Sequence, residues 1–156
     1  MFNLFKKNWV PKIIPISRME GYHTHYIGVM KNGNQFFGYT TFAFVENKPI
    51  HKDWEEKRKE YSVIYIFDKK GNLINTECKF IGFTNEIKFD KPKIELDKMM
   101  LNLGLIKFQD IKVKPFKTTI DNIVFGLIPV NENKSIILEP SNTIAFFEPW
   151  DGEYYT

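Results

Sequence analysis

The residues best placed for chemistry are His23 and His25, which Thr24 separates. If this segment is a β-strand, both imidazoles point to the same side, about 6.6 Å apart along the strand, and could reach one metal ion. A third ligand would have to come from elsewhere in the chain, and the candidates are His51, Asp53, Glu55, Glu56 and Cys78. The pair therefore indicates either a metal-assisted hydrolase or two half-exposed histidines near the end of a sheet.

Cys78 is the single cysteine of the chain and could act as a nucleophile with His23 or His25 as its base. The strand pattern around it, however, predicts that Cys78 shares a buried face with Ile64 and Phe80. We therefore interpret Cys78 as a core residue. One cysteine forms no intramolecular disulfide, which favours a reducing, cytoplasmic compartment.

Two pairs of carboxylates could support acid/base catalysis, Asp53 with Glu56 and Asp151 with Glu153. Both pairs lie in polar or terminal segments, too solvated for the burial that such catalysis requires. The sequence also contains no glycine-rich phosphate-binding loop, no G-x-S-x-G and no H-E-x-x-H. It therefore favours a protein that is not an enzyme, and it predicts no cofactor.

Aromatic side chains supply the candidate binding surface. Trp and Tyr anchor many protein interfaces. The C-terminal segment is unusually aromatic for a chain end, so it either packs back on the sheet or presents its rings to a partner. The candidate binding residues are Trp54, Tyr61, Tyr65, Trp150, Tyr154 and Tyr155.

Lysines near aromatic residues offer a further possibility, single-stranded nucleic-acid binding, because bases stack on rings along a basic groove. Lys112 and Lys114 alternate with Ile111 and Val113, which is equally typical of the solvent face of an edge strand. The net charge of only +3 makes nucleic acid the weaker expectation. Another protein is the predicted partner.

The length of 156 residues predicts a single domain, residues 1–156. Its first 19 residues carry four basic side chains and no acid, whereas only acids follow Lys134. Residues 1–18 are therefore either a loosely attached basic segment or a segment drawn to the acidic C-terminal end. No secretory signal and no membrane-spanning run is recognisable, so we expect a cytoplasmic protein that does not enter a membrane.

Three segments have the pattern of β-hairpins. The first joins 22–30 to 35–45 through Asn32-Gly33; a two-residue turn there pairs His25 with Thr40 and makes both faces apolar. The second joins 61–67 to 73–81 through a type I turn with Gly71 in the left-handed position. We expect a buried face with Ile64, Ile66, Ile74, Cys78 and Phe80, and a wetter face with Tyr61, Tyr65, Asn75, Glu77 and Lys79.

The third hairpin joins 111–119 to 123–130 through Asp121-Asn122, and two short strands follow at 136–138 and 143–147. Between the second and third hairpins an apolar i, i+3, i+4, i+7 pattern predicts a helix over 92–103. Residues 46–59 form either an exposed loop or a short helix with Asp53 as N-cap. The predicted fold class is α+β, mostly β: an antiparallel meander of hairpins with one main helix packed on the sheet.

Several turn and core motifs resemble a family of small bacterial proteins labelled as similar to formate hydrogenlyase regulatory proteins. The motifs are Tyr26-Ile27-Gly28, Gly33-Asn34-Gln35-Phe36, Phe67-Asp68 with Gly71-Asn72, Val124-Phe125-Gly126-Leu127 and Pro149-Trp150-Asp151-Gly152. The resemblance spans about residues 16–156, implies a regulator, and offers no catalytic residues to carry over. In size the chain is also similar to immunity proteins of bacterial toxin systems. The expected function is therefore protein binding, as a regulator or as an immunity-type inhibitor.

Overall fold

The computed structural model describes residues 8–45 and 52–156, and in these ranges it contains three antiparallel sheets. A five-stranded sheet has the order β5-β4-β3-β2-β6, a four-stranded sheet has the order β11-β10-β9-β8, and β1 pairs with β7. The strands are β1 (Ile14–Ile16), β2 (Tyr26–Met30), β3 (Gln35–Phe44), β4 (Arg58–Phe67), β5 (Leu73–Phe83), β6 (Ile106–Phe108), β7 (Ile111–Val113), β8 (Phe116–Ile120), β9 (Ile123–Val130), β10 (Ser135–Glu139) and β11 (Ala145–Phe146).

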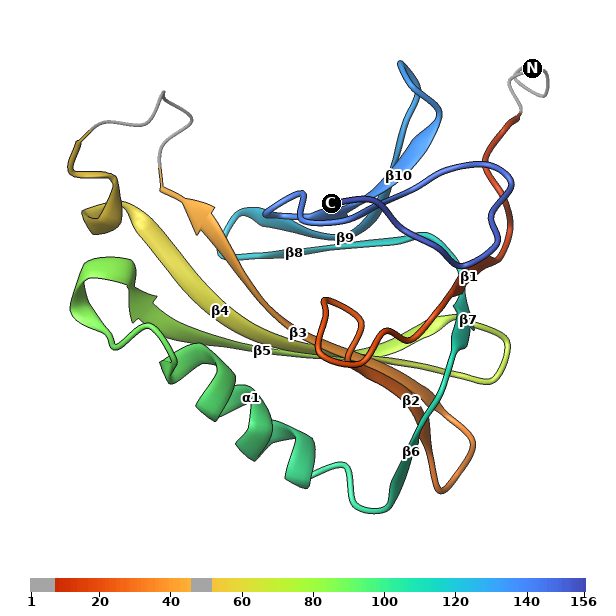
Figure 1. Cartoon of the computed structure of the whole chain (residues 1–156), viewed down its shortest axis with the longest axis horizontal. Helices are drawn as coiled ribbons and strands as arrows, with labels where there is room; N and C mark the ends of the chain where they lie inside the picture. The colour runs from red at the N-terminus through yellow and green to blue at the C-terminus, as the bar shows by residue number, and fades with distance from the viewer. Residues whose placement is uncertain (1–7, 46–51) are drawn as a thin grey trace.

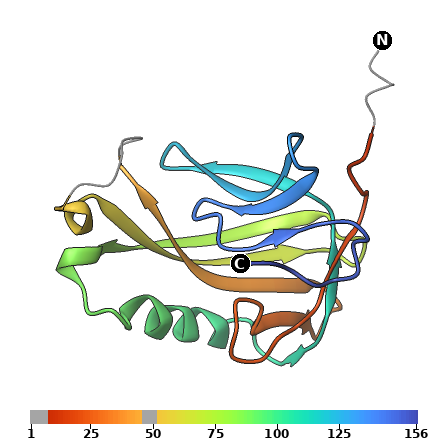
Figure 2. The same ribbon diagram turned by 45° about the horizontal axis from the view of Figure 1, so that its top comes forward.

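The α-helix α1 (Lys91–Leu101) lies along one face of the five-stranded sheet, and the four-stranded sheet covers the other face (Figures 1 and 2). Two 3-10 turns, η2 (Trp54–Glu56) and η3 (Thr84–Glu86), lie at the ends of β4 and β5. The predicted class, α+β and mostly β with one main helix on the sheet, is confirmed. Within the described residues, none of the helices is long and apolar enough to cross a membrane.

Two apolar cores result from this three-layer arrangement. The larger core lies between the two sheets, and its fully buried aromatic residues are Phe37, Tyr61, Tyr65, Phe67, Phe125 and Phe146. The smaller core lies under α1 and comprises Phe36, Ile64, Ile66, Leu96 and Met100. Both faces of β3 and β4 are therefore covered, as the sequence predicts for the first hairpin but not for the second.

The prediction that one face of the second hairpin is partly exposed to solvent is wrong. Tyr61 and Tyr65 are fully buried, because β8 and β9, distant in the sequence, cover that face. A bulge between Ile66 and Phe67 also shifts the register of β4 and β5, so that Cys78 pairs with Val63 and shares the face of the tyrosines. The predicted turn is present: Gly71 has φ +91 and donates its N–H to the Asp68 carbonyl at 3.0 Å.

The register of the first hairpin differs from the prediction by one residue. The loop contains three residues, because Gly33 donates to the Met30 carbonyl (2.9 Å) and Met30 donates to that of Asn34 (2.8 Å). Gly33 then takes the positive φ of the left-handed position, +92. Gln35 consequently faces Val29.

The third hairpin turns as predicted, with positive φ at Asp121 (53) and Asn122 (64). The strand expected over 111–119 is divided at Pro115 into β7 and β8, and β7 pairs with β1 near the N-terminus. Gln35 fastens this small sheet to β3: its side-chain amide donates to the Lys112 carbonyl (2.8 Å), and its oxygen accepts the Lys112 N–H (2.8 Å).

The helix over 92–103 is confirmed, with observed bounds Lys91–Leu101. The Ser62 hydroxyl donates to the Pro92 carbonyl at 2.7 Å and fixes the start of α1 on β4. Nearer the C-terminal end of α1, Gly38 allows the helix to approach β3 closely, since a Cβ on Gly38 would lie 3.2 Å from the Met100 sulfur.

The first described residues lie against the C-terminal segment. Trp9 stacks on Trp150 with a centroid distance of 6.3 Å, and Ser17 donates its N–H to the Gly152 carbonyl at 3.0 Å. Within 8–18 the N-terminal segment is not loosely attached, because Ile14 and Ile16 belong to the larger core. Residues 1–7 lie outside the described residues.

Residues 46–51, including His51, also lie outside the described residues. The remainder of the predicted polar segment contains η2, with Asp53 in the N-cap position but without a side-chain capping bond. The strand β4 then begins at Arg58, earlier than the sequence predicts.

Candidate peptide-binding groove

The two histidines do not lie on a strand, contrary to the prediction. They belong to the turn that precedes β2, where His23 is exposed and His25 is half-buried. The Gly21 N–H donates to His25 Nδ1 at 2.9 Å, and Arg18 Nε donates to the His25 carbonyl at 2.7 Å. One ring nitrogen of His25 is thus already occupied by a backbone hydrogen bond.

Among the described residues, the structure brings no further ligand to this pair, and His51, one of the candidates, lies outside those residues. In the ranges 8–45 and 52–156, three or more His, Cys, Asp or Glu side chains nowhere gather as they would around a metal ion. Cys78 lies half-buried in the larger core, and burial raises the pKa of its thiol to about 12. A thiol with this pKa is protonated near neutral pH and is a poor nucleophile.

The aromatic candidates are in very different environments. Tyr61 and Tyr65 are buried and cannot contact a partner at the surface, so this assignment is wrong. Trp150 and Tyr154 are half-buried against the larger core, and Tyr155 is 64% exposed. Trp54 is half-buried under the Arg58 guanidinium, which lies 4.8 Å from the ring centroid. A binding role for Trp54, Trp150, Tyr154 and Tyr155 stays a prediction.

A different feature stands out in the structure: one half of β3 has an open edge. The strand is ten residues long, and β2 pairs with it only from Gln35 to Gly38. On the opposite edge β4 pairs with β3 as far as Phe44. From Tyr39 to Phe44, no other described residue forms a strand along the β2 side.

Thr24 explains why β2 begins no earlier than Tyr26. The Thr24 side chain is buried, donates to the Ser17 carbonyl at 2.8 Å and accepts the Met19 N–H at 2.9 Å. These bonds fold residues 17–25 into a compact turn instead of an extended strand. Because an isolated threonine favours strands as well as turns, the sequence contains no clear signal for the open edge.

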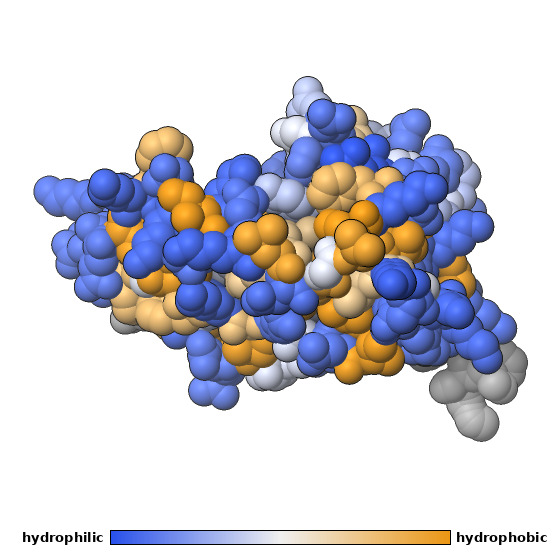
Figure 3. Space-filling view, turned by 90° about the horizontal axis from the view of Figure 1, so that it is seen from below, coloured by the Kyte–Doolittle hydropathy of each residue, from blue (hydrophilic) through white to orange (hydrophobic). Residues whose placement is uncertain are grey.

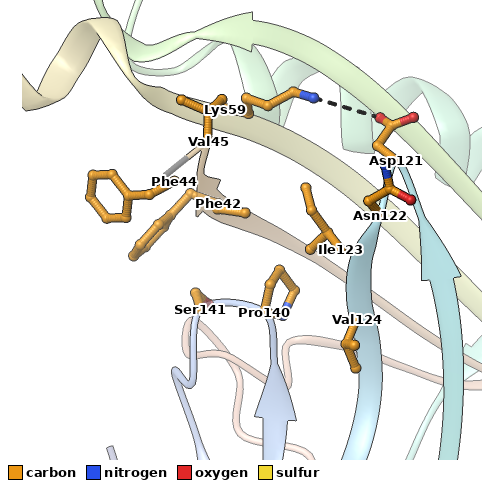
Figure 4. A pocket seen from close by; sticks show the side chains of 11 residues that line it. Phe42, Phe44, Val45, Lys59, Asp121, Asn122, Ile123, Val124, Pro140 and Ser141 are labelled. Atoms are coloured by element: carbon orange, nitrogen blue, oxygen red, sulfur yellow. Dashed lines mark ion pairs between the residues drawn. The ribbon is translucent and has the colours of Figure 1, made fainter. Parts of the chain in front are cut away.

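A cleft of about 790 Å³ lies beside the last residues of β3, between this strand and the turns of the four-stranded sheet (Figure 4). Phe42 and Phe44 lie on the β3 side, and Ile123 and Pro140 lie opposite. Lys59 and Asp121 form an ion pair at its rim with Nζ and Oδ2 3.9 Å apart. Figures 1 and 2 show β3 ending beside the β8–β9 turn.

A second cleft of about 510 Å³ lies beside the middle of β3, between the histidine turn and α1. Its lining includes His23, His25, Tyr26, Thr40 and Lys93. The Lys93 ammonium donates to the Tyr26 hydroxyl (3.2 Å) and forms an ion pair with Asp97 (3.2 Å). The hydrogen bond to Tyr26 raises the pKa of Lys93, so this side chain remains charged.

The two clefts follow one edge. Gly38, Tyr39 and Thr40 line the second cleft, and 42–45 line the first, with Thr41 between them. We call these clefts, with the open edge from Tyr39 to Phe44, the β3 groove. The Thr41 hydroxyl donates to the Ser141 hydroxyl at 2.8 Å and so fixes Ser141, which lines the first cleft, against β3.

The face of the molecule that carries α1 also exposes apolar side chains, which polar residues separate in Figure 3. The exposed apolar residues of α1 and its flanking segments are Phe89, Ile94, Leu101 and Leu105. The β3 groove differs from this face because it combines concave shape with unpaired backbone groups. Comparison of this chain with protein-family models, with curated proteins and with solved structures finds no match.

Proposed function

We propose that the protein acts by binding another protein in the β3 groove. The observation that carries this proposal is the pair of clefts along the open half of β3. Open strand edges and clefts are both common sites of recognition between proteins. As a small bacterial protein in the cytoplasm, it would act as a regulator or as an immunity-type inhibitor.

The charges of the groove support a protein partner over a nucleic acid. Lys59 is paired with Asp121 in the first cleft, and Lys93 is paired with Asp97 beside the second. Each acid offsets one of the positive charges that phosphate binding would need. Among the described lining residues, these two lysines are the only lysine or arginine side chains, too few for a run of cations along the groove.

The residues of the groove also favour binding over catalysis. The only titratable groups at the second cleft are two histidines, three tyrosines and Lys93 among its described lining residues. The thiol of Cys78 is in the larger core and has a pKa too high for nucleophilic attack. These observations support a non-enzymatic role.

The proposal is tested with the full chain as bait in a native-host lysate, followed by affinity measurement with the purified partner. Val45→Asp places a charge at the rim of the first cleft and should weaken binding about tenfold or more. Ile74→Asp is the matched control, because Ile74 is 53% exposed on β5 and Val45 is 50% exposed. Equal affinity of Val45→Asp and wild type, or recovery of no specific partner, would contradict the proposal.

A further inference from the structure

The geometry points to a specific mode of recognition in the β3 groove, and this inference rests on the proposed function. We infer that the groove takes an extended segment of the partner as an added strand, antiparallel to β3. The segment carries apolar side chains at alternate positions and a carboxylate at its C-terminal end. Each part of this inference follows from a different property of the groove.

The backbone of β3 supplies the main contact. Met30 donates to the Asn34 carbonyl, and Val45 donates to the Lys57 carbonyl at 2.9 Å. Even-numbered residues of β3 therefore direct their N–H and C=O groups towards the β2 side, and odd-numbered residues direct theirs towards β4. It follows that the backbone groups of Thr40, Phe42 and Phe44 face the open edge.

These three residues are spaced to pair with one short strand. From Thr40 to Phe44 the open edge is about 17 Å long, enough for about five residues of a partner. An added strand would form hydrogen bonds with the N–H and C=O groups of all three residues, as β2 does with β3 between Gln35 and Gly38. Main-chain bonds of this kind provide affinity without regard to side-chain identity.

The walls of the first cleft select the side chains of the segment. On one face the added residues lie beside Phe42 and Phe44, whose rings pack edge to face at 6.1 Å. On the other face they lie towards Ile123, Val124 and Pro140. These residues give each wall an apolar part, while Lys59, Asp121, Asn122 and Ser141 make the rest of the lining polar. Apolar side chains at alternate positions of the segment fit the apolar part.

The second cleft selects the end of the segment. Antiparallel pairing is the more stable arrangement, and β3 runs towards the first cleft, so the C-terminal end of the partner segment reaches the second cleft. Lys93 is the only lysine, arginine or carboxylate residue among the described residues that line it, and its side chain is 65% exposed. The Lys93 ammonium has three N–H groups, and Tyr26 and Asp97 accept two of them. A carboxylate, from an acidic side chain or from a chain terminus, accepts from the third.

The experiment uses ten-residue peptides selected by phage display on the immobilised full chain, and then synthesised for affinity measurement. Phe42→Pro removes the N–H that faces the open edge, and an edge strand tolerates proline where its N–H faces solvent. Phe42→Ala removes the same ring but keeps the N–H, so it is the matched control. We expect Phe42→Pro to bind about tenfold more weakly than Phe42→Ala. Equal affinity of the two variants would overturn strand addition.

A second measurement does not depend on the folding of a proline variant. On peptide binding, the amides of Thr40, Phe42 and Phe44 in the wild-type chain should become protected from hydrogen exchange, and unchanged exchange would overturn the inference. If Lys93 binds the chain terminus, Lys93→Gln should lower the affinity for peptides with a C-terminal carboxylate more than for the same peptides with a C-terminal amide. If Lys93 binds an acidic side chain, the two affinities should fall equally. If Lys93→Gln bound both forms as tightly as wild type, the role of Lys93 would be overturned.

Failure of this binding mode and failure of the proposed function give different results. Peptides that lose affinity for Val45→Asp but bind Phe42→Pro and Phe42→Ala equally would show binding in the groove without strand addition. If the selected peptides bound Val45→Asp as tightly as wild type, the binding site would lie elsewhere and the proposed function would be contradicted. A concentration-dependent dimer that Phe42→Pro abolishes would overturn the inference in favour of a second copy of this chain.

Discussion

The hydroxyl oxygens of Tyr39 and Tyr65 lie 2.9 Å apart in the core between the two large sheets. The Tyr39 hydroxyl also donates to the Glu139 carbonyl at 3.1 Å, so the proton between the tyrosines comes from Tyr65. Burial raises the pKa of both side chains above the ordinary range of tyrosine. Both hydroxyl groups therefore remain protonated donors, and the chain of bonds links β4 and β3 to β10.

Removing the hydroxyl of Tyr39 should cost more stability than removing that of Tyr65. Tyr39→Phe leaves the buried Tyr65 hydroxyl without its acceptor and removes the donor to the Glu139 carbonyl, and should lower the free energy of unfolding by about 2–3 kcal/mol. Tyr65→Phe removes one donor only and should cost about 1 kcal/mol. Urea denaturation measures both, with the exposed Tyr155→Phe as control. Equal losses for the two buried tyrosines would contradict this arrangement.

Gln35 should be required for the attachment of β7 to β3. Gln35→Met keeps the volume but leaves the Lys112 N–H and carbonyl without their partners. We expect the free energy of unfolding to fall by about 2 kcal/mol. The control is Gln109→Met, since Gln109 is exposed. Unchanged stability of Gln35→Met in thermal or urea denaturation would show that water replaces these bonds at little cost.

Cys78 should react slowly in the folded protein. With a pKa of about 12 against an ordinary value of 9.0, only about one thiol in 10⁴ is ionised at pH 8. Mass spectrometry should therefore detect much slower alkylation by iodoacetamide in the folded than in the urea-unfolded chain, and the folded rate should rise with pH up to about 12. Rapid labelling of the native protein at pH 8 would contradict the burial of this thiol.

The same shift makes stability depend on pH in the alkaline range. Because the pKa of Cys78 is higher in the folded state, the protonated thiol stabilises the fold below pH 9, and this contribution is lost as the pH rises from 9 towards 12. Cys78→Ala should reduce that part of the alkaline loss of stability. Identical pH profiles of variant and wild type between pH 8 and 11 would show that other groups account for the loss.

Amide exchange of the free protein should alternate along the end of β3. The amides of Thr40, Phe42 and Phe44 face the open edge, whereas those of Thr41 and Ala43 face β4. Hydrogen exchange followed by NMR should therefore be fast for the first group and slow for the second. Uniform protection from Thr40 to Phe44 would mean that another segment covers this edge.

Zinc should not stabilise the protein through the two histidines. Backbone donation occupies His25 Nδ1, and the part of the chain that the structure describes provides no third ligand beside them. Addition of Zn²⁺ should leave the melting temperature of wild type and of His23→Ala equal within error. A rise in the melting temperature of wild type that His23→Ala abolishes would support the metal hypothesis.

Local features of the fold follow directly from the sequence. The turns at Asp68–Asn72 and Asp121-Asn122 are predicted correctly because positive φ angles strongly favour Gly, Asn and Asp. The helix is predicted because an apolar stripe of period 3.6 depends only on neighbouring residues. The register of the first hairpin is not predicted, since Asn32-Gly33 suits both a two-residue loop and the three-residue loop that forms.

By itself, then, the sequence determined an antiparallel α+β fold, its hairpins and its helix, because these depend on residues close together in the chain. Tertiary structure alone decided that both faces of β4 are buried and which edge of the sheet is open. Tyr61 and Tyr65 are core residues because β8 and β9 cover them from far along the chain. The β3 groove exists because the Thr24 hydroxyl bonds to Ser17 and Met19, which ends β2 before it can pair with the rest of β3.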